Sequence, residues 1–262
     1  TMSNDRDREF SRRTALGALG FGTAAALAAG SAMAAKTKDK VTIYHVEGRR
    51  SQRVIWLCEE LGIPYEALFK RGDILGSINQ IKAINPAMAL APTIVFREKT
   101  MVESGAILEY LMSQFPGGDK LAPRKSSPDY ADYLMWMHFA EGSAACRIGA
   151  EATRIMNGGE KVIKPTMMGG VFRIMGAQEV VDYAENYIKV NPYFGGQTFS
   201  SADIMMEFVA TYIKSMPFDP ATYPKLAEWQ AKVQQRPAYL RAMKVGAPDG
   251  LDKYRPKPKP AA

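Results

Sequence analysis

The chain has 262 residues, a formal net charge of +7 and a hydrophobic fraction of 47%. These values are those of an ordinary globular protein with room for one large domain or two small ones. The positive charge is spread along the chain without a long Lys/Arg block, so we expect no nucleic-acid partner. With two histidines, two cysteines and no ligand spacing typical of a metal site, we predict no bound metal.

Residues 1–34 have the layout of an export signal. Arg12 and Arg13 precede an apolar stretch rich in Ala and Gly, which ends in small residues at Ala34. The layout resembles a twin-arginine signal, although Ala15 stands where such signals usually carry Phe. We therefore expect export to the periplasm by that route, cleavage near Ala34, and contact with a membrane only during export.

The next part of the chain alternates between strand and helix patterns. Apolar spacing and turn residues predict strands at 41–46, 65–69 and 91–96, a hairpin closed by Met101–Val102, and helices at 51–61 and 73–84 and from Glu103 onward. A strand, a helix and a second parallel strand form a right-handed βαβ unit. The fold class expected for this part, residues 40–117, is α/β.

The remainder of the chain is predicted to be all-α. A stretch rich in Pro, Gly and Ser at 115–129 has the composition of a linker, and helical patterns follow at about 129–150, 170–190, from Ser201, and at 224–235 as the last helix. We expect a helical domain over 128–247 and, without apolar periodicity, a Pro/Lys-rich tail over 248–262.

Two positions have a structural interpretation. Cys58 falls on the apolar face of the helix at 51–61, which predicts a small buried thiol. Ser200 and Asp203 precede an apolar run at the spacing of a capping box, so we expect them to start a helix and assign them no catalysis.

Five segments together resemble the bacterial glutathione S-transferase family. They read S-Q-R-V-I-W-L-C-E-E-L-G-I-P-Y-E, N-P…A-P-T-I-V, V-E-S-G-A-I-L-E-Y-L, W-M-H-F-A-E-G-S and F-S-S-A-D-I, in the family's order and spacing, between residues 41 and 246. The resemblance implies a thioredoxin-like N-terminal domain, an all-helical C-terminal domain, glutathione as co-substrate and a homodimer.

The resemblance also implies residues that bind glutathione. Pro92 should follow a cis peptide bond, and the backbone of Ala91 should pair with the glutathione cysteine like an added strand. Glu103 and Ser104 stand at a strand-to-helix junction, where free N–H groups bind carboxylates, and in the family they hold the γ-glutamyl end. An ordinary helix cap is the alternative for Ser104.

Three residues are candidates for activating the glutathione thiol, and the sequence leaves the choice open. Ser51 could donate to the thiolate or only cap its helix. Tyr44 could donate through its phenol or be a plain strand aromatic. Arg49, standing where relatives often carry a serine, could supply positive charge alone. Glu141, on the first helix of the second domain, is interpreted as a packed or solvated position.

The leading functional hypothesis is an exported transferase that adds the glutathione thiolate to a hydrophobic electrophile. A second hypothesis keeps glutathione but changes the reaction to ether cleavage, dehalogenation or peroxide reduction. A third is a non-catalytic ligand-binding protein on the same fold.

Overall fold

The computed structural model describes residues 39–156, 166–168, 172–174, 176–213 and 220–251. Residues from Val41 onward belong to one compact unit, which is described below. The predicted export signal lies outside the described residues, as does the predicted tail beyond Leu251. Within the described ranges, no helix combines the length and the apolar character needed to cross a membrane.

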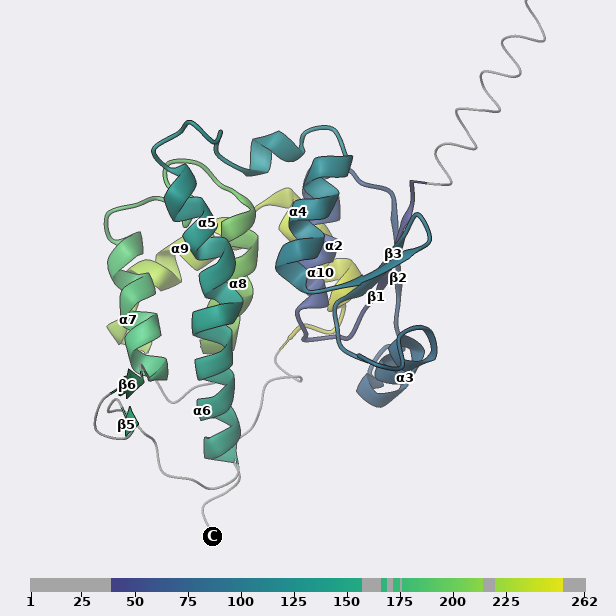
Figure 1. The fold of residues 1–262 in the computed structure, drawn as a ribbon, viewed down its shortest axis with the longest axis horizontal. Helices are drawn as coiled ribbons and strands as arrows, with labels where there is room; N and C mark the ends of the chain where they lie inside the picture. Colours follow the sequence, from purple (N-terminus) through teal and green to yellow (C-terminus); the bar gives the residue numbers. More distant parts are fainter. Residues whose placement is uncertain (1–38, 157–165, 169–171, 175, 214–219, 252–262) are drawn as a thin grey trace, which may run out of the picture. The chain divides into compact units, whose positions relative to one another are not determined.

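A four-stranded mixed sheet of order β2-β1-β3-β4 forms the first half of this unit (Figure 1). Strand β1 runs parallel to β2 and antiparallel to β3, which pairs antiparallel with β4. The predicted βαβ unit and the predicted hairpin are therefore both present. The strands are β1 (Val41–Tyr44), β2 (Tyr65–Leu68), β3 (Thr93–Phe96) and β4 (Lys99–Val102).

Three helices accompany this sheet. Helix α2 (Ser51–Leu61) connects β1 to β2 and packs beside α4 (Ser104–Gln114), whereas α3 (Ile74–Ile84) lies apart from both (Figure 1). Helix α2 ends at Gly62, whose φ of 64° is the left-handed C-cap conformation that glycine adopts at no steric cost. Cys58 is buried and free, as predicted, and its burial raises the pKa of the thiol.

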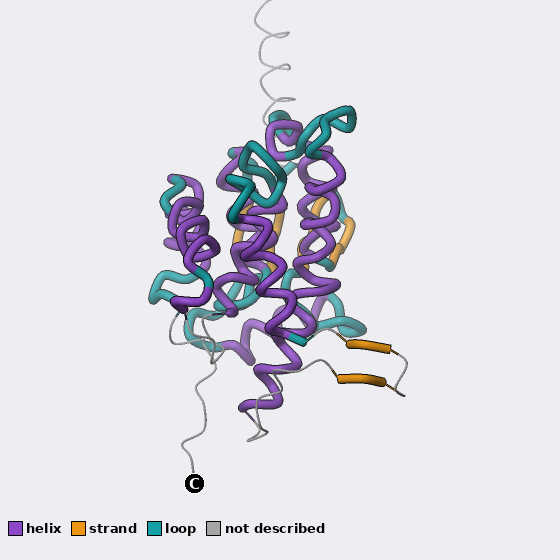
Figure 2. Tube along the Cα trace, turned by 90° about the vertical axis from the view of Figure 1, so that its left-hand side faces the viewer, coloured by secondary structure: helices purple, strands orange, loops and turns teal. Residues whose placement is uncertain are grey.

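Helices make up most of the second half (Figure 2). The 115–129 connection contains the short 3₁₀ helix η1 and leads into one long helical stretch, which is interrupted by a π-helical turn, η2. The elements are η1 (Gly118–Leu121), α5 (Tyr130–Phe139), η2 (Ala140–Ala145), α6 (Cys146–Met156), α7 (Ala177–Ile188), α8 (Ser201–Ile213), η3 (Pro220–Thr222), α9 (Pro224–Gln234) and α10 (Pro237–Gly246).

The prediction of a helix from about residue 170 was wrong for its first turns. Residues Phe172–Ile174 form strand β6, which pairs antiparallel with β5 (Thr166–Met168). Helix α7 begins only after Gly176, whose N–H donates to the Glu179 carboxylate at 2.9 Å. This side-chain cap satisfies a backbone donor that would otherwise lack a partner, and it fixes the start of the helix.

Helix α10 was not predicted, because the helix at 224–235 was expected to be the last. Pro237 is the first residue of α10, a position where the missing proline N–H costs nothing. Helix α10 returns to the first half of the unit and packs closely on α2. The approach is tight at Gly246, because a Cβ there would meet the Gln52 Oε1 atom at 2.1 Å.

The predicted start of α8 is confirmed. The Ser200 hydroxyl accepts from the Ala202 N–H at 3.2 Å, and the Asp203 carboxylate accepts from the Ser200 N–H at 2.8 Å. Asp203 is fully buried and also accepts from the Phe194 N–H and the Trp229 indole. One carboxylate thus joins the start of α8 to the preceding loop and to α9.

Candidate functional site

The turns at one end of the sheet meet because of the strand register. Tyr44, at the end of β1, pairs with Thr93, at the start of β3, and Thr93 pairs with Val102, at the end of β4. The β1–α2 turn, the loop before β3 and the start of α4 therefore lie side by side. These are the three segments that hold the site residues predicted from the sequence.

The peptide bond between Ala91 and Pro92 is cis, as the resemblance implied. Ala91 is half-buried, and its backbone N–H and C=O have no hydrogen-bond partner in the described part of the chain. Unpaired main-chain groups that extend a strand can pair with an extended peptide, which then adds to the sheet. The structure therefore leaves Ala91 available for the backbone pairing expected of it.

Glu103 has an unusual backbone conformation at the start of α4. Its φ of 71° is positive, which is uncommon for a residue with a side chain and is found preferentially at functional sites. Its side chain is exposed and does not cap the helix. Within the described residues, the N–H groups of Ser104, Gly105 and Ala106 have no acceptor. The start of α4 is therefore an open anion site.

The side chain of Arg53, on α2, contacts the start of α4. Its side chain is only 1% exposed, and one guanidinium nitrogen donates to the Ser104 hydroxyl at 2.9 Å. Another nitrogen donates to the Met205 carbonyl at 2.6 Å. Because Ser104 only accepts in this contact, its own proton remains available to a ligand at the start of α4.

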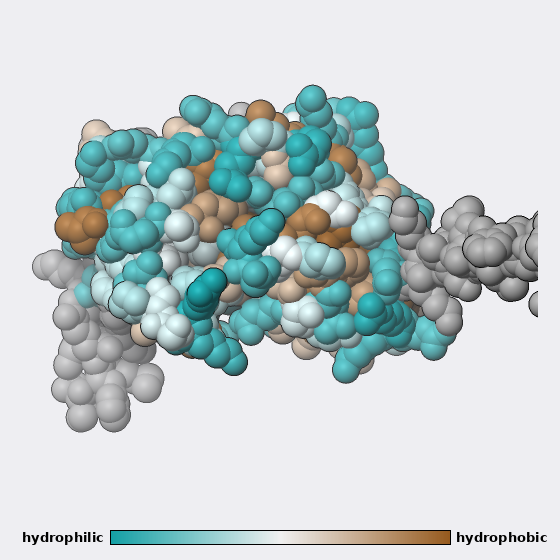
Figure 3. Space-filling view, turned by 90° about the horizontal axis from the view of Figure 1, so that it is seen from above, coloured by the Kyte–Doolittle hydropathy of each residue, from teal (hydrophilic) through white to brown (hydrophobic). Residues whose placement is uncertain are grey.

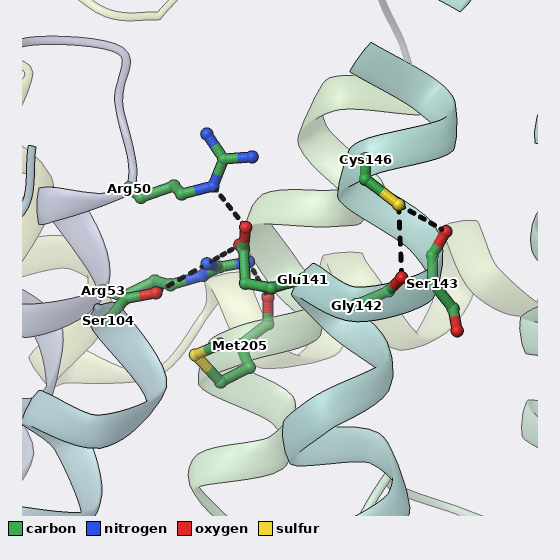
Figure 4. A network of polar contacts seen from close by, with 8 residues as sticks. All are labelled: Arg50, Arg53, Ser104, Glu141, Gly142, Ser143, Cys146 and Met205. Atoms are coloured by element: carbon green, nitrogen blue, oxygen red, sulfur yellow. Dashed lines mark hydrogen bonds and ion pairs between the residues drawn. The ribbon is translucent and has the colours of Figure 1, made fainter. Parts of the chain in front are cut away.

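Glu141 compensates the charge of Arg53 from the second half of the chain (Figure 4). It forms an ion pair with Arg53 and accepts a second hydrogen bond from Arg50 at 2.7 Å. Burial alone would raise the pKa of Glu141, but the Arg53 charge and the hydrogen bonds from both arginines lower it below its ordinary value. Two guanidinium groups thus face this carboxylate, and a second carboxylate, Glu207 on α8, also acts electrostatically on Arg53.

The π-helical turn explains how Glu141 reaches this cluster. Glu141 is the second residue of η2 (Ala140–Ala145), which lies between α5 and α6. A π turn inserts an extra residue and rotates the faces of the helix before and after it, and such turns occur frequently at functional sites. Glu141 was predicted to be a packed or solvated helix position, because apolar periodicity alone does not reveal a π turn.

Ser51 occupies a different place from the one expected of a thiol activator. The residue is fully buried, and its hydroxyl lies 2.8 Å from His45 Nδ1 and 3.1 Å from the Val46 nitrogen. The other ring nitrogen of His45, Nε2, lies 2.6 Å from the Gly246 carbonyl oxygen. A carbonyl oxygen only accepts, so Nε2 carries the proton and Nδ1 of the neutral ring is an acceptor.

The Ser51 proton is therefore donated to His45. Desolvation lowers the pKa of His45 to about 4, so the ring is neutral near pH 7 and this arrangement holds there. Ser51 does not cap its helix either, because no side-chain hydrogen bond caps α2. This geometry argues against both interpretations of Ser51, as donor to a thiolate and as helix cap. The sequence analysis had assigned no role to His45.

Arg49 and the start of α2 remain candidates for activating the thiol. Arg49 is half-buried, and one of its guanidinium nitrogens donates to the Gly48 carbonyl at 3.1 Å. The N–H groups of Arg50 and Ser51 have no acceptor among the described residues, and the first turn of α2 has no acidic side chain. A cation and two free N–H groups at a helix start can stabilise a thiolate.

Tyr44 lies on the other face of β1 from the site helices. Ile43 is buried in the core that includes Val54 on α2, and successive strand side chains point to opposite faces. Tyr44 is half-buried. The structure therefore favours the strand-aromatic interpretation of Tyr44 over the phenol-donor interpretation.

This fold and site define a class of protein. It combines a thioredoxin-like sheet with a cis-proline, an open helix start beside that proline, and an appended helical half. Sequence comparison identifies the family: residues 43–119 match the N-terminal domain of glutathione S-transferases, and residues 176–237 match their C-terminal domain. The two matches together span more than half of the chain, which belongs to the glutathione S-transferase family.

A curated relative agrees with this assignment, and solved structures share the fold. Glutathione S-transferase 3 of Schizosaccharomyces pombe is 29% identical over 210 residues, which are 76% of this chain and 84% of the relative. A glutathione S-transferase from Actinobacillus pleuropneumoniae has a TM-score of 0.65 at 20% identity, covering 82% of this chain and 96% of that one. A theta-class enzyme from Xanthomonas axonopodis pv. citri, solved with glutathione bound, has a TM-score of 0.59 at 23% identity, covering 80% and 98%. Members of this family use glutathione as their co-substrate.

Proposed function

We propose that this protein binds glutathione and transfers its thiolate to a hydrophobic electrophile, as a detoxifying transferase. The observation that carries the proposal is the convergence, at one end of the sheet, of the unpaired backbone of Ala91 and the open start of α4. The first supplies main-chain pairing for the cysteine of the tripeptide, and the second supplies donors for a carboxylate.

The two ends of glutathione match the charges of the site. The γ-glutamyl end has an α-carboxylate for the free N–H groups at Ser104 and Gly105, and an α-ammonium that needs acidic neighbours. Glu103 and Glu141 are the acidic residues beside this helix start, and Arg53 joins Glu141 to Ser104. The Arg50 guanidinium is partly exposed and suits an anionic peptide.

Thiol activation is assigned to Arg49 and the start of α2. A free thiol has a pKa of about 8.5, and lowering it by ~2 units requires ~2.7 kcal/mol of differential stabilisation. A cation together with free N–H groups at a helix start is the kind of environment that provides this stabilisation. The proton leaves for solvent, and the thiolate forms a C–S bond with the electrophilic carbon while the leaving group, chloride in 1-chloro-2,4-dinitrobenzene, departs to solvent.

A non-catalytic glutathione-binding protein is the second candidate. The observation in its favour is the Ser51 proton, which is donated to His45 rather than to a ligand. In this case glutathione binds at the same residues, but no serine hydroxyl activates it. Ether cleavage, dehalogenation or peroxide reduction would use the same glutathione site with another electrophile.

Two further expectations belong to the proposal. The protein acts as a homodimer, as the resemblance implies. It is exported to the periplasm by the twin-arginine route, because residues 1–34 have the layout of such a signal. Replacing Arg12 and Arg13 together by Lys should retain the protein in the cytoplasm on cell fractionation. Unchanged periplasmic recovery of that variant would contradict the route.

Glutathione binding and turnover test the proposal directly. Calorimetric titration should show one glutathione site per chain, and 1-chloro-2,4-dinitrobenzene should be conjugated at a rate above the uncatalysed one. Ser104→Ala should weaken glutathione binding by about tenfold, because it removes a donor to the carboxylate. The matched control is Ser113→Ala, on the same helix, where the hydroxyl is exposed and donates only to the Tyr110 carbonyl.

The outcomes separate the candidates. Binding with conjugation supports the transferase, whereas binding without turnover of several electrophiles supports the non-catalytic protein. Absence of glutathione binding would exclude both.

A further inference from the structure

Glu47, in the turn between β1 and α2, is a charged side chain inside the protein. Hydrophilic residues predominate on the face of the molecule shown in Figure 3, and the surface is where a glutamate ordinarily lies. Glu47 is instead only 2% exposed, and it forms no ion pair with any residue that the structure describes. A buried carboxylate without a cation lowers stability, so its presence in this turn requires another explanation.

The strand register brings this turn beside the turn that follows β2. Tyr44 pairs with Leu68 in the parallel strands β1 and β2, and the His45 N–H donates to the Leu68 carbonyl at 2.9 Å. The two chain segments therefore leave the sheet at the same edge. There the Glu47 carboxylate accepts through Oε2 from the Gly72 N–H at 2.6 Å. Because a hydrogen bond to a carboxylate is about twice as strong as a neutral one, Glu47 holds the β2–α3 turn firmly.

The β2–α3 turn has a defined backbone conformation of its own. Gly72 has a φ of 72°, which glycine adopts readily and other residues rarely do, and the Asp73 N–H donates to the Lys70 carbonyl at 3.0 Å. Arg71 also forms an ion pair with Asp249, in the segment after α10. Both partners of that pair are exposed, so it holds the turn only weakly, and the buried bond from Glu47 is the stronger attachment.

The second carboxylate oxygen of Glu47, Oε1, is buried and has no hydrogen-bond partner among the described residues. Such unpaired groups are rare inside folded proteins, because each one costs free energy. An apolar side chain of the same size would avoid this cost altogether. A role in stability therefore does not explain the carboxylate, whereas a role in holding the turn does.

The β1–α2 turn contains the groups assigned to thiol activation. Arg49 follows Glu47 by two residues, and Gly48 between them has a φ of 68°. The Arg49 N–H donates to the Val46 carbonyl and the Gln52 N–H donates to the Arg49 carbonyl, both at 3.1 Å. These bonds shape the turn internally, whereas Glu47 attaches it to the neighbouring turn. The place of Arg49 therefore depends on the bond from Glu47 to Gly72.

We propose that Glu47 is a positioning residue for thiol activation. Its bond to Gly72 fixes the β1–α2 turn, so that the Arg49 cation and the free N–H groups at the start of α2 stay directed at the glutathione sulfur. The inference rests on the proposed function, since it concerns the thiol that Arg49 is proposed to activate. Glu47 is too deeply buried to contact glutathione, so it acts through the turn.

Two uncharged substitutions of similar size separate the hydrogen bond from the charge. Glu47→Met removes both, whereas Glu47→Gln keeps an amide oxygen for the Gly72 N–H. Glu47→Met should raise the pKa of bound glutathione by about one unit and lower kcat about fivefold at pH ~6.5, with KM for glutathione changed less than about twofold. In Glu47→Gln the thiol pKa should stay within about 0.3 units of the wild-type value. Loss of the negative charge alone would lower the thiol pKa in both variants, so the sign of the change distinguishes positioning from electrostatics.

Asp73→Ala is the matched control in the same loop. It removes another carboxylate that binds a glycine N–H, because Asp73 Oδ1 accepts from Gly76 at 2.7 Å as the N-cap of α3. Loss of this cap should lower stability and leave the thiol pKa unchanged, since the Asp73 side chain does not hold the β1–α2 turn. A purely structural role of Glu47 would give the same result in Glu47→Met.

Hydrogen exchange of the full chain without glutathione tests the coupling of the two turns independently of transferase activity. Backbone N–H groups of residues 46–53 should exchange about tenfold faster in Glu47→Met than in wild type, and at the wild-type rate in Glu47→Gln and Asp73→Ala. The proposal is overturned by unchanged exchange in Glu47→Met, by an unchanged or lowered thiol pKa in that variant, or by equal thiol pKa values in Glu47→Met and Glu47→Gln. If the wild type binds no glutathione, the proposed function fails, and the exchange rates alone decide whether Glu47 positions the turn.

Discussion

His45 and Ser51 form a hydrogen-bonded pair in which the direction of donation is determined, because His45 Nε2 must donate to the Gly246 carbonyl. This pair connects the end of β1, the start of α2 and the end of α10. It occupies the Ser51 hydroxyl proton at the start of α2, where the sequence suggested a thiol activator.

Ser51→Ala should therefore affect stability more than catalysis. Removing the hydroxyl leaves the buried Val46 N–H and His45 Nδ1 without their partner, which should lower the free energy of unfolding by ~1–3 kcal/mol. We expect kcat/KM for conjugation to change by less than about threefold, or ~0.7 kcal/mol. Chemical denaturation and steady-state kinetics on the same preparation check both numbers. A large loss of kcat with unchanged stability would restore Ser51 as the activating residue.

Arg49→Gln should affect catalysis more than stability. Without the cation beside the start of α2, the pKa of bound glutathione should rise by about one unit, equivalent to ~1.4 kcal/mol. The measurement is the thiolate absorbance of the complex as a function of pH. The control is Arg124→Gln, at an exposed arginine of the α4–α5 connection. Equal thiol pKa values in both variants would exclude Arg49 from activation.

Glu141→Gln should destabilise the protein and weaken glutathione binding together. Arg53 is 1% exposed and would lose its carboxylate partner, whereas Glu141 itself is 30% exposed. Breaking a fully buried pair costs 3–5 kcal/mol, and the partial exposure of Glu141 reduces our expectation to ~2 kcal/mol. Denaturation and glutathione titration measure the two effects. Glu98→Gln, at an exposed hairpin residue, should change neither.

His45 and Asp203 should give the protein a flat stability profile in mild acid. Burial lowers the pKa of His45 to about 4, so its contribution to stability is present above pH ~6.5 and is lost as the pH falls toward 4. Burial raises the pKa of Asp203 to about 6, so its contribution is present below pH ~4 and is lost as the pH rises through 6. Each contribution is ~3 kcal/mol at most, and the two oppose each other between pH 4 and 6.

Single variants separate these two contributions. His45→Gln should remove the loss of stability that His45 causes in acid. The contribution of Asp203 then remains, so the free energy of unfolding should fall as the pH rises from 4 to 6. Asp203→Asn should show the opposite slope over the same range. Urea unfolding at a series of pH values measures both slopes, and parallel profiles for the two variants would contradict the assignment.

The sequence predicted the sheet and the site segments because local chemistry determines them. Gly62 ends α2 through its positive φ, and the apolar spacing of Val54, Leu57 and Cys58 predicted the helix, although the structure buries every residue from Ser51 to Cys58 and not one face alone. The cis bond at Pro92 came from the family resemblance, since an X–Pro bond is trans by default.

The features that sequence reasoning missed depend on contacts between distant segments. Ser51 was assigned a role from its place in a motif, but its partner His45 is oriented by Gly246, far along the chain. Glu141 reaches Arg53 through a π turn, which leaves no mark in the apolar periodicity. The helix at 224–235 was expected to be the last, although Pro237 begins α10, which packs on α2 far back along the chain.

The buried guanidinium of Arg53 has a consequence for recombination between relatives. Its two main partners, Glu141 and the Met205 carbonyl, both come from the helical half of the chain. A chimaera that joins the first 117 residues to the helical half of another transferase would fold well only if the donor places a carboxylate where Glu141 stands. The halves are therefore exchangeable as co-adapted pairs and not as independent modules.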